Sequence, residues 1–119
     1  MVNELHFYNL NSNLGTNIPL TAITSEVIND GELYYQVRNG VCYIIGWGVK
    51  FKTLGSALLI SENMPQVKKF FSVPIFKDGD TTKKVANFFI GESGPKYLRC
   101  HVYEIDTPVY FTVSYLVNS

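Results

Sequence analysis

The sequence predicts an antiparallel all-β domain, either a sandwich or a barrel. Turn signals built from Gly, Asn, Asp and Pro recur about every ten residues, which is the spacing of short antiparallel strands. The apolar runs between these turns have strand length, and none keeps the i, i+3, i+4, i+7 pattern of an amphipathic helix for three turns. The chain also contains 8 Tyr and 8 Phe, and aromatic residues favour strands.

A β-hairpin over residues 33–50 is the clearest element. Two apolar-rich runs, 33–38 and 41–50, are separated only by Asn39 and Gly40, the pair that most readily forms a type I′ turn. A bare hairpin is marginal in water, so the rest of the chain must supply the strands that cover it.

The second strand of this hairpin has two faces, because strand side chains alternate. One face carries Val41, Tyr43, Ile45, Trp47 and Val49. We expect this face to line the core. The other face carries Cys42, Ile44, Gly46, Gly48 and Lys50. Its two glycines would allow another sheet, a partner chain or a ligand to approach the backbone closely.

The other strands follow in chain order. Short runs at 20–23 and 26–28 precede an Asn-Asp-Gly turn at 29–31 that leads into the hairpin. Later strands are predicted at 57–60, 70–76, 84–90, 96–104 and 109–117. Residues 61–69 are expected to form a loop between sheets. Pro74 lacks an N–H, which places its strand at an edge or at a bulge.

The length of 119 residues fits one domain, which we assign to residues 20–119, with residues 1–19 as a lead-in or linker. Ten basic and ten acidic residues cancel, so nucleic acid is not expected as a partner. No apolar run reaches the roughly 20 residues that cross a bilayer, so no membrane insertion is expected. The first residues lack the basic and apolar segments of a secretory signal, which predicts synthesis in a cytoplasm.

No reaction centre stands out, so no enzyme activity, metal or cofactor is expected. His6 and His101 lie at opposite ends of the chain without a zinc-ligand spacing. Cys42 and Cys100 also lack such a spacing, and we expect both to be small buried hydrophobic residues. The Asp-Gly-Asp segment at 78–80 lacks the later Glu of a calcium loop and is interpreted as a turn.

The predicted strand at 96–104 supplies the main candidate site. Its aliphatic and cysteine residues share one face, and the opposite face carries Tyr97, Arg99, His101 and Tyr103. This second face combines flat rings with hydrogen-bond donors, which suits a sugar ligand. A subunit interface is the alternative, since Tyr and Arg are also enriched at interfaces. Trp47 is a further candidate, as an anchor in the core or an interface, or as a platform for a sugar.

Four segments carry a recognisable order of features. They are YYQVRNGVCYIIGWGVK (34–50), ALLISENMPQVKKFFSVPIF (57–76), VANFFIGESGPKYLRCHV (85–102) and YFTVSYLV (110–117). In this order they resemble the C-terminal head domains of bacteriophage tail fibres and receptor-binding proteins. The resemblance covers roughly the last two thirds of the chain. One departure is at 63–67, where Asn-Met-Pro-Gln-Val replaces the usual Pro-x-Gly-φ-Arg-Pro turn.

The resemblance implies an antiparallel β-sandwich of the jelly-roll type, usually a homotrimer at the tip of a fibre, that adheres to polysaccharide on the host-cell surface. The leading hypothesis is a non-catalytic receptor-binding module at the tail tip of a virion, attached to other phage tail or baseplate proteins. The first alternative is an adaptor or collar protein that assembles the virion without binding sugar. The second is a small hydrolase, which would need paired carboxylates about 5 to 10 Å apart. Its candidates are Glu92, Glu104 and Asp106.

Overall fold

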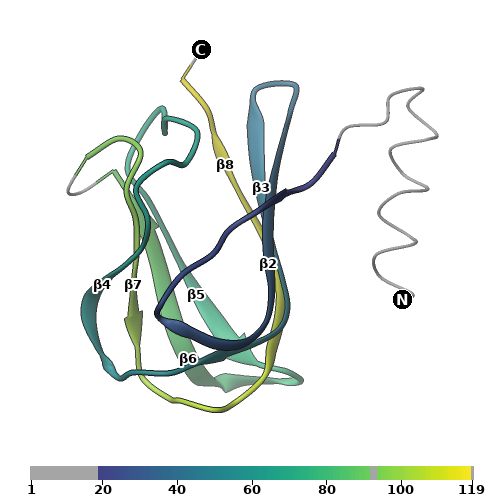
Figure 1. Cartoon of the computed structure of the whole chain (residues 1–119), viewed down its shortest axis with the longest axis vertical. Helices are drawn as coiled ribbons and strands as arrows, with labels where there is room; N and C mark the ends of the chain where they lie inside the picture. Colours follow the sequence, from purple (N-terminus) through teal and green to yellow (C-terminus); the bar gives the residue numbers. More distant parts are fainter. Residues whose placement is uncertain (1–18, 92–93, 119) are drawn as a thin grey trace.

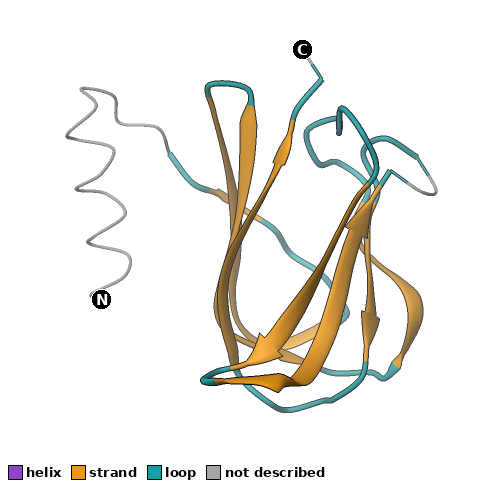
Figure 2. Cartoon of the chain, turned by 180° about the vertical axis from the view of Figure 1, so that it is seen from behind, coloured by secondary structure: helices purple, strands orange, loops and turns teal. Residues whose placement is uncertain are grey.

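The computed structural model describes residues 19–91 and 94–118, which form two antiparallel sheets packed face to face (Figures 1 and 2). The strands are β1 (Thr21–Ala22), β2 (Ile28–Arg38), β3 (Val41–Phe51), β4 (Gly55–Ser61), β5 (Phe71–Lys77), β6 (Asp80–Ile90), β7 (Leu98–Val102) and β8 (Val109–Leu116). Sheet A has the order β1-β2-β3-β8, and sheet B has the order β4-β7-β6-β5. The predicted β-sandwich is therefore confirmed. The predicted lead-in falls almost entirely outside the described residues.

The chain fills sheet A first, then the whole of sheet B, and returns to sheet A with its last strand. The connections from β3 to β4 and from β7 to β8 cross between the sheets at the same end of the sandwich (Figure 1). The β2–β3 hairpin turns at the opposite end, where Asn39 and Gly40 have φ angles of 51° and 77°. The predicted Asn-Gly turn is confirmed, because these positive φ angles are those that a type I′ turn requires.

The core lies between the two sheets and is joined by rings. Phe88 of sheet B packs edge-on against Phe51 and Phe111 of sheet A, with ring centroids 6.2 and 5.3 Å apart. Phe111 reaches this position by lying over Gly46, since a Cβ atom on Gly46 would be 2.3 Å from the Phe111 ring. The close approach predicted at Gly46 is thus made by the neighbouring strand of the same sheet.

The face of β3 that lines the core is the face of Cys42 and Ile44, and not the face that we predicted from the sequence. Cys42 and Ile44 are fully buried, whereas Tyr43, Ile45 and Trp47 lie half-buried on the outer face of sheet A. The prediction was wrong because the more apolar face of β3 lies on the outside of sheet A, so the number of apolar residues did not identify the inner face. Val49, predicted for the same face as Trp47, is buried after all. A register shift between Trp47 and Val49 moves the strand to its other face at that point.

The segment between β4 and β5 closes one end of the sandwich. It joins opposite edges of sheet B, so the expectation of a loop between sheets was wrong. Met64 and Val67 are buried, and Val67 pairs with Val117 beyond the end of β8. The Tyr115 hydroxyl donates to the Pro65 carbonyl at 2.8 Å. The segment that departs from the phage-head motif therefore acts as a hydrophobic plug.

Both cysteines are free and buried, as predicted, one on the inner face of each sheet. Burial raises the pKa of the Cys100 thiol to about 12 and also raises that of Cys42. Pro74 lies in β5, an edge strand of sheet B, which confirms its predicted placement. Within the part of the chain that the structure describes, no helix has the length and apolarity to cross a membrane.

Candidate functional site

Two glycines that face each other on β2 and β3 shape the outer face of sheet A. Gly31 has a φ of 94° and Gly48 a φ of 64°, and a Cβ atom on Gly31 would lie 2.3 Å from the Gly48 carbonyl oxygen. The register between the two strands shifts between Ile28 and Asp30 and again between Asp30 and Glu32, at the contact itself. The Asn-Asp-Gly segment predicted as a turn thus lies within β2, with Asn29 as an extra residue. Opposite Gly31, β3 has an extra residue at Gly48 and forms a bulge. Such bulges redirect side chains, and this one turns both Trp47 and Lys50 outward.

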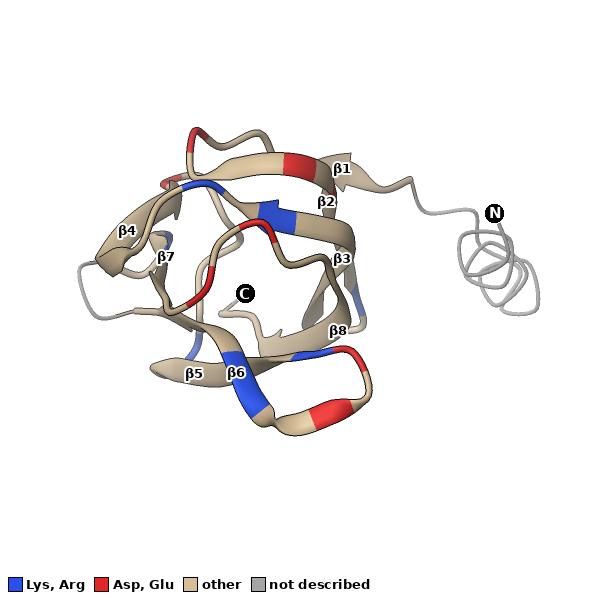
Figure 3. Ribbon diagram, turned by 90° about the horizontal axis from the view of Figure 1, so that it is seen from below, with Lys and Arg blue, Asp and Glu red and all other residues tan. Residues whose placement is uncertain are grey.

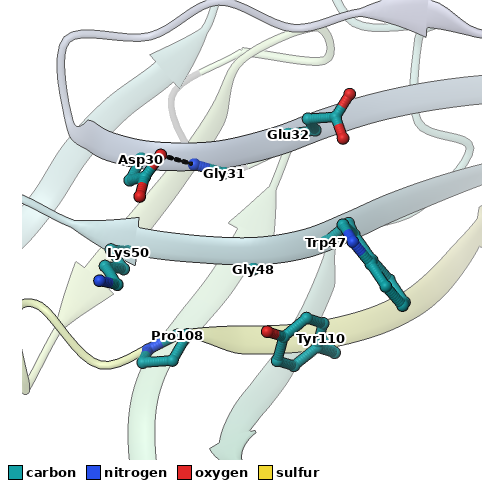
Figure 4. Close-up of a pocket in the computed structure, with 8 residues that line it drawn as sticks. All are labelled: Asp30, Gly31, Glu32, Trp47, Gly48, Lys50, Pro108 and Tyr110. Carbon is teal, nitrogen blue, oxygen red and sulfur yellow. Dashed lines mark hydrogen bonds between the residues drawn. The ribbon is translucent and has the colours of Figure 1, made fainter. Parts of the chain in front are cut away.

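The bulge opens a hollow of about 500 Å³ at the end of sheet A, which we call the Trp47 hollow. Its lining residues are Asp30, Gly31, Glu32, Trp47, Gly48, Lys50, Pro108 and Tyr110. Figure 4 shows the two rings side by side at one end, and Asp30, Lys50 and Pro108 at the other. The hollow is broad and open, so it suits a ligand that lies on the surface.

Two aromatic side chains form the apolar wall of this hollow. The rings of Trp47 and Tyr110 meet edge to face, with centroids 4.9 Å apart and an interplanar angle of 77°. Tyr110 is 44% exposed and lies beside Gly48, where a side chain would fill the space next to the Tyr110 hydroxyl. Because Gly48 has no side chain, the space beside the Tyr110 ring stays open and forms the bottom of the hollow. Ring surfaces of this kind take the apolar faces of ligands.

Charged groups line the rest of the hollow. The Asp30 carboxylate accepts a hydrogen bond from the Gly31 N–H at 2.8 Å, and one Glu32 oxygen accepts from the Tyr34 hydroxyl. These bonds orient both carboxylates and leave further acceptor sites on them. Lys50, a donor, lies opposite Asp30 in the β2–β3 register. Convergent acceptors and a donor beside two rings can bind a ligand that has many hydroxyl groups.

The four residues predicted on the strand at 96–104 lie together on the outer face of sheet B. Arg99 and His101 point outward from β7, and Tyr97 and Tyr103 flank the strand. The His101 and Tyr103 rings stack 4.2 Å apart at 14°. The Arg99 guanidinium lies 5.8 Å from the Tyr97 ring, and Lys84 of β6 lies 5.2 Å from the Tyr103 ring. We call these five residues the cationic strip.

Trp47 is not part of that group, because β3 belongs to sheet A and β7 to sheet B. The structure instead places it with Asp30, Glu32, Lys50 and Tyr110, which sequence reasoning did not select. A signal was present in the two glycines at 31 and 48. The sequence indicates a turn at Gly31 and a close approach at Gly48, but only the pairing of β2 with β3 shows that the two glycines face each other.

The carboxylates proposed for a hydrolase have other surroundings. The Asp106 carboxylate accepts a hydrogen bond from the Asn29 amide at 3.2 Å. One Glu104 oxygen is buried and has no hydrogen-bond partner among the described residues. Glu92 lies outside the described residues. Within residues 19–91 and 94–118, no three His, Cys, Asp or Glu side chains gather in a way that could hold a metal ion.

Comparison with solved structures finds a similar fold in the head domain of phage bIL170, which is described among the receptor-binding domains of lactococcal phages. The match covers 85% of this chain and 99% of that one, with a TM-score of 0.53 and 16% sequence identity. No protein-family model and no curated protein matches the chain. The resemblance to phage head domains seen in the sequence is confirmed in the fold, and the chain has the fold of the bIL170 head domain.

Proposed function

We propose that this protein is a receptor-binding module of a phage tail that attaches the virion to carbohydrate on the host-cell surface through the Trp47 hollow. The observation that supports it most is the pairing of exposed rings with oriented carboxylates around an open floor. The fold shared with a phage receptor-binding domain supports the biological setting. The module is made in the host cytoplasm and works at the tail tip.

A sugar matches the groups in the hollow. Its apolar C–H patch packs against the Trp47 and Tyr110 rings, while its hydroxyls donate to Asp30 and Glu32 and accept from Lys50. The hollow is open, so a single site binds weakly. Avidity then supplies the strength, since linking three heads raises the effective concentration of the second and third sites. We therefore propose a homotrimer joined to other tail or baseplate proteins.

The module holds its ligand without cleaving it. The two carboxylates in the hollow are both engaged by neighbouring donors and act as acceptors for hydroxyls. Polysaccharide of unchanged length after long incubation with the protein is the expected result. Shortened chains would instead indicate a hydrolase.

An adaptor or collar that assembles the virion without binding sugar is the second candidate. It is favoured by the apolar outer face of sheet A, where Tyr43 and Ile45 are half-buried and Leu116 is 60% exposed. Such a face fits a protein partner. A stable trimer in light scattering, together with no hit on a glycan array, would support this alternative.

The test is a glycan array with the full chain, followed by titration of the best glycan against variants of the hollow. Trp47→Ala and Tyr110→Ala each remove one ring and are expected to weaken binding roughly tenfold. Asp30→Asn keeps the shape of the side chain and removes the charge, so a smaller loss is expected. Thr112→Ala changes an exposed position on the same face of β8 and serves as the matched control. Unchanged affinity in both ring variants would refute the proposed site.

A further inference from the structure

The rings of the cationic strip differ from those of the Trp47 hollow in what already lies against them. Tyr103 has the Lys84 ammonium 5.2 Å from its centroid and the His101 ring stacked on it at 4.2 Å. Tyr97 has the Arg99 guanidinium against it at 5.8 Å. A ligand approaching the strip therefore meets the Lys84 and Arg99 cations beside the rings, together with the Tyr103 ring, which is 46% exposed.

Lys84 and Tyr103 of the strip are exposed, and Tyr97, Arg99 and His101 are half-buried. β7 lies between β4 and β6, so the strip runs along the middle of the outer face of sheet B. Alternate residues on a strand are about 7 Å apart, and the strip presents a donor or a ring at each such step. Beside it, Asn87 is paired with His101 in register and donates to the Ser72 hydroxyl at 2.9 Å. The face thus offers neutral hydrogen-bonding groups next to the cations.

The strands of sheet B also carry an excess of positive charge. They contain Lys77, Lys83, Lys84 and Arg99 but only one acidic residue, Asp80. Figure 3 shows the acidic tip of the β5–β6 hairpin next to basic residues on β6. Hydrogen bonds from Thr82, and then the charges of Lys83 and Lys77, lower the pKa of the Asp80 carboxyl. Lys83 and Lys77 are thus close enough to Asp80 to favour its charged form, whereas Lys84 lies over the strip.

We propose that the cationic strip is a second binding site, separate from the Trp47 hollow, whose ligand is an acidic polysaccharide with carboxylate or phosphate groups on its sugars. Lys84 and Arg99 bind the anionic groups, and Asn87 and Ser72 bind neighbouring hydroxyls. An extended polymer is favoured over a single sugar because the strip presents a donor or a ring at each alternate position along β7. Single-stranded nucleic acid, whose bases stack on exposed rings, is the alternative that the experiment must exclude.

The experiment measures binding of the full chain to immobilised polygalacturonate, a carboxylated polysaccharide, with neutral dextran as the reference polymer. Binding to polygalacturonate and not to dextran is expected. The double variant Lys84→Gln/Arg99→Gln is expected to lose roughly tenfold in affinity, since each exposed ionic contact contributes little alone. Lys83→Gln removes the same charge one residue away on β6, beside Asp80, and is expected to change affinity less than about twofold.

Two further variants guard against a folding defect and against confusion with the first site. Arg99 also donates to the Ala57 carbonyl at 2.9 Å, so Arg99→Lys, which keeps the charge, should retain binding. Trp47→Ala should bind polygalacturonate like the parent chain even if it loses its neutral glycan. Equal binding to dextran, equal loss in Lys83→Gln, loss in Trp47→Ala, or binding only to single-stranded DNA would each overturn the proposal.

Discussion

On the outer face of sheet A, the rings of Trp47 and Tyr110 border an open hollow, whereas on the outer face of sheet B the rings of Tyr97 and Tyr103 lie against cations. Both faces combine aromatic and charged residues, so composition alone does not distinguish them. The difference is in backbone geometry. Sheet A is bulged where β2 and β3 carry facing glycines, which leaves space beside its rings. In sheet B the β6–β7 pairing has no register shift, and the Lys84 and Arg99 cations lie against the rings that flank β7.

The bulge is the feature on which this contrast depends, so its removal should have the largest effect. Gly31→Ala places a Cβ atom 2.3 Å from the Gly48 carbonyl oxygen at a φ of 94°. The clash and the strained backbone should together lower the free energy of unfolding by about 3 kcal/mol. Urea denaturation measures this change.

The matched control for that variant is Gly40→Ala. Gly40 also has a positive φ, 77°, but nothing lies within 4 Å of an added Cβ atom. Only the backbone strain remains, so a loss of about 1 kcal/mol is expected. Equal losses at the two glycines would show that the close approach of β2 and β3 adds nothing to the cost of a side chain at Gly31.

The inner faces of the two sheets each carry one buried cysteine, and both cysteines should make the folded chain less stable at high pH. Cys42 and Cys100 have raised pKa values because they are buried, and that of Cys100 is about 12 against an ordinary 9.0. Above about pH 9 the unfolded chain releases these thiol protons and the folded chain does not, so stability falls as pH rises toward 12.

By about pH 10.5 the contribution of Cys100 to this loss is on the order of 2 kcal/mol. Urea midpoints measured at several pH values between about 8 and 10.5 test it. The variant Cys100→Ala removes the titrating group and should show a shallower decline. An identical decline in both proteins would exclude Cys100 as a source of the pH dependence.

The variant Tyr115→Phe should modestly destabilise the packing of the segment between β4 and β5 that closes one end of the sandwich. The change removes the hydrogen bond from the Tyr115 hydroxyl to the Pro65 carbonyl and keeps the ring, which packs against Phe71 at a centroid distance of 5.6 Å. A loss of about 1 kcal/mol in the free energy of unfolding is expected. Glycan binding at the Trp47 hollow should be unaffected, because Tyr115 is on the inner face and does not line it.

Much of the fold could be predicted from the sequence, because it depends on local signals. The Asn39-Gly40 pair predicted the central hairpin, because it favours the positive φ angles of a tight turn. Pro74 predicted an edge strand, because it lacks an N–H. Both properties depend on one or two residues only. The inner face of β3 was predicted wrongly, because the face of Tyr43 carries more large apolar residues than the face of Cys42 and yet lies outside. Which face lies inside depends on Phe88 and Phe111, which are distant in sequence and meet only in the folded chain.

Of the two candidate sites, one could be predicted from the sequence and the other could not. Residues of the cationic strip on β7 were found because they alternate along one strand. The Trp47 hollow was not found, because it combines residues from β2, β3 and the start of β8 across two register shifts. Pairing of this kind follows from tertiary structure, and a glycine in a strand indicates only that some close approach or bulge is present.

Salt provides the last and smallest test of the contrast between the two faces. Exposed ionic contacts weaken as the screening length shortens from roughly 14 Å at about 50 mM to roughly 6 Å at about 300 mM salt. Binding of polygalacturonate to the cationic strip should therefore fall several-fold over this range. Binding of a neutral glycan at the Trp47 hollow should change less than about twofold, since ring packing and neutral hydroxyl contacts are little screened. Parallel salt dependence of the two ligands would contradict this contrast, and a Lys84→Gln variant that weakened both would show that they share one site.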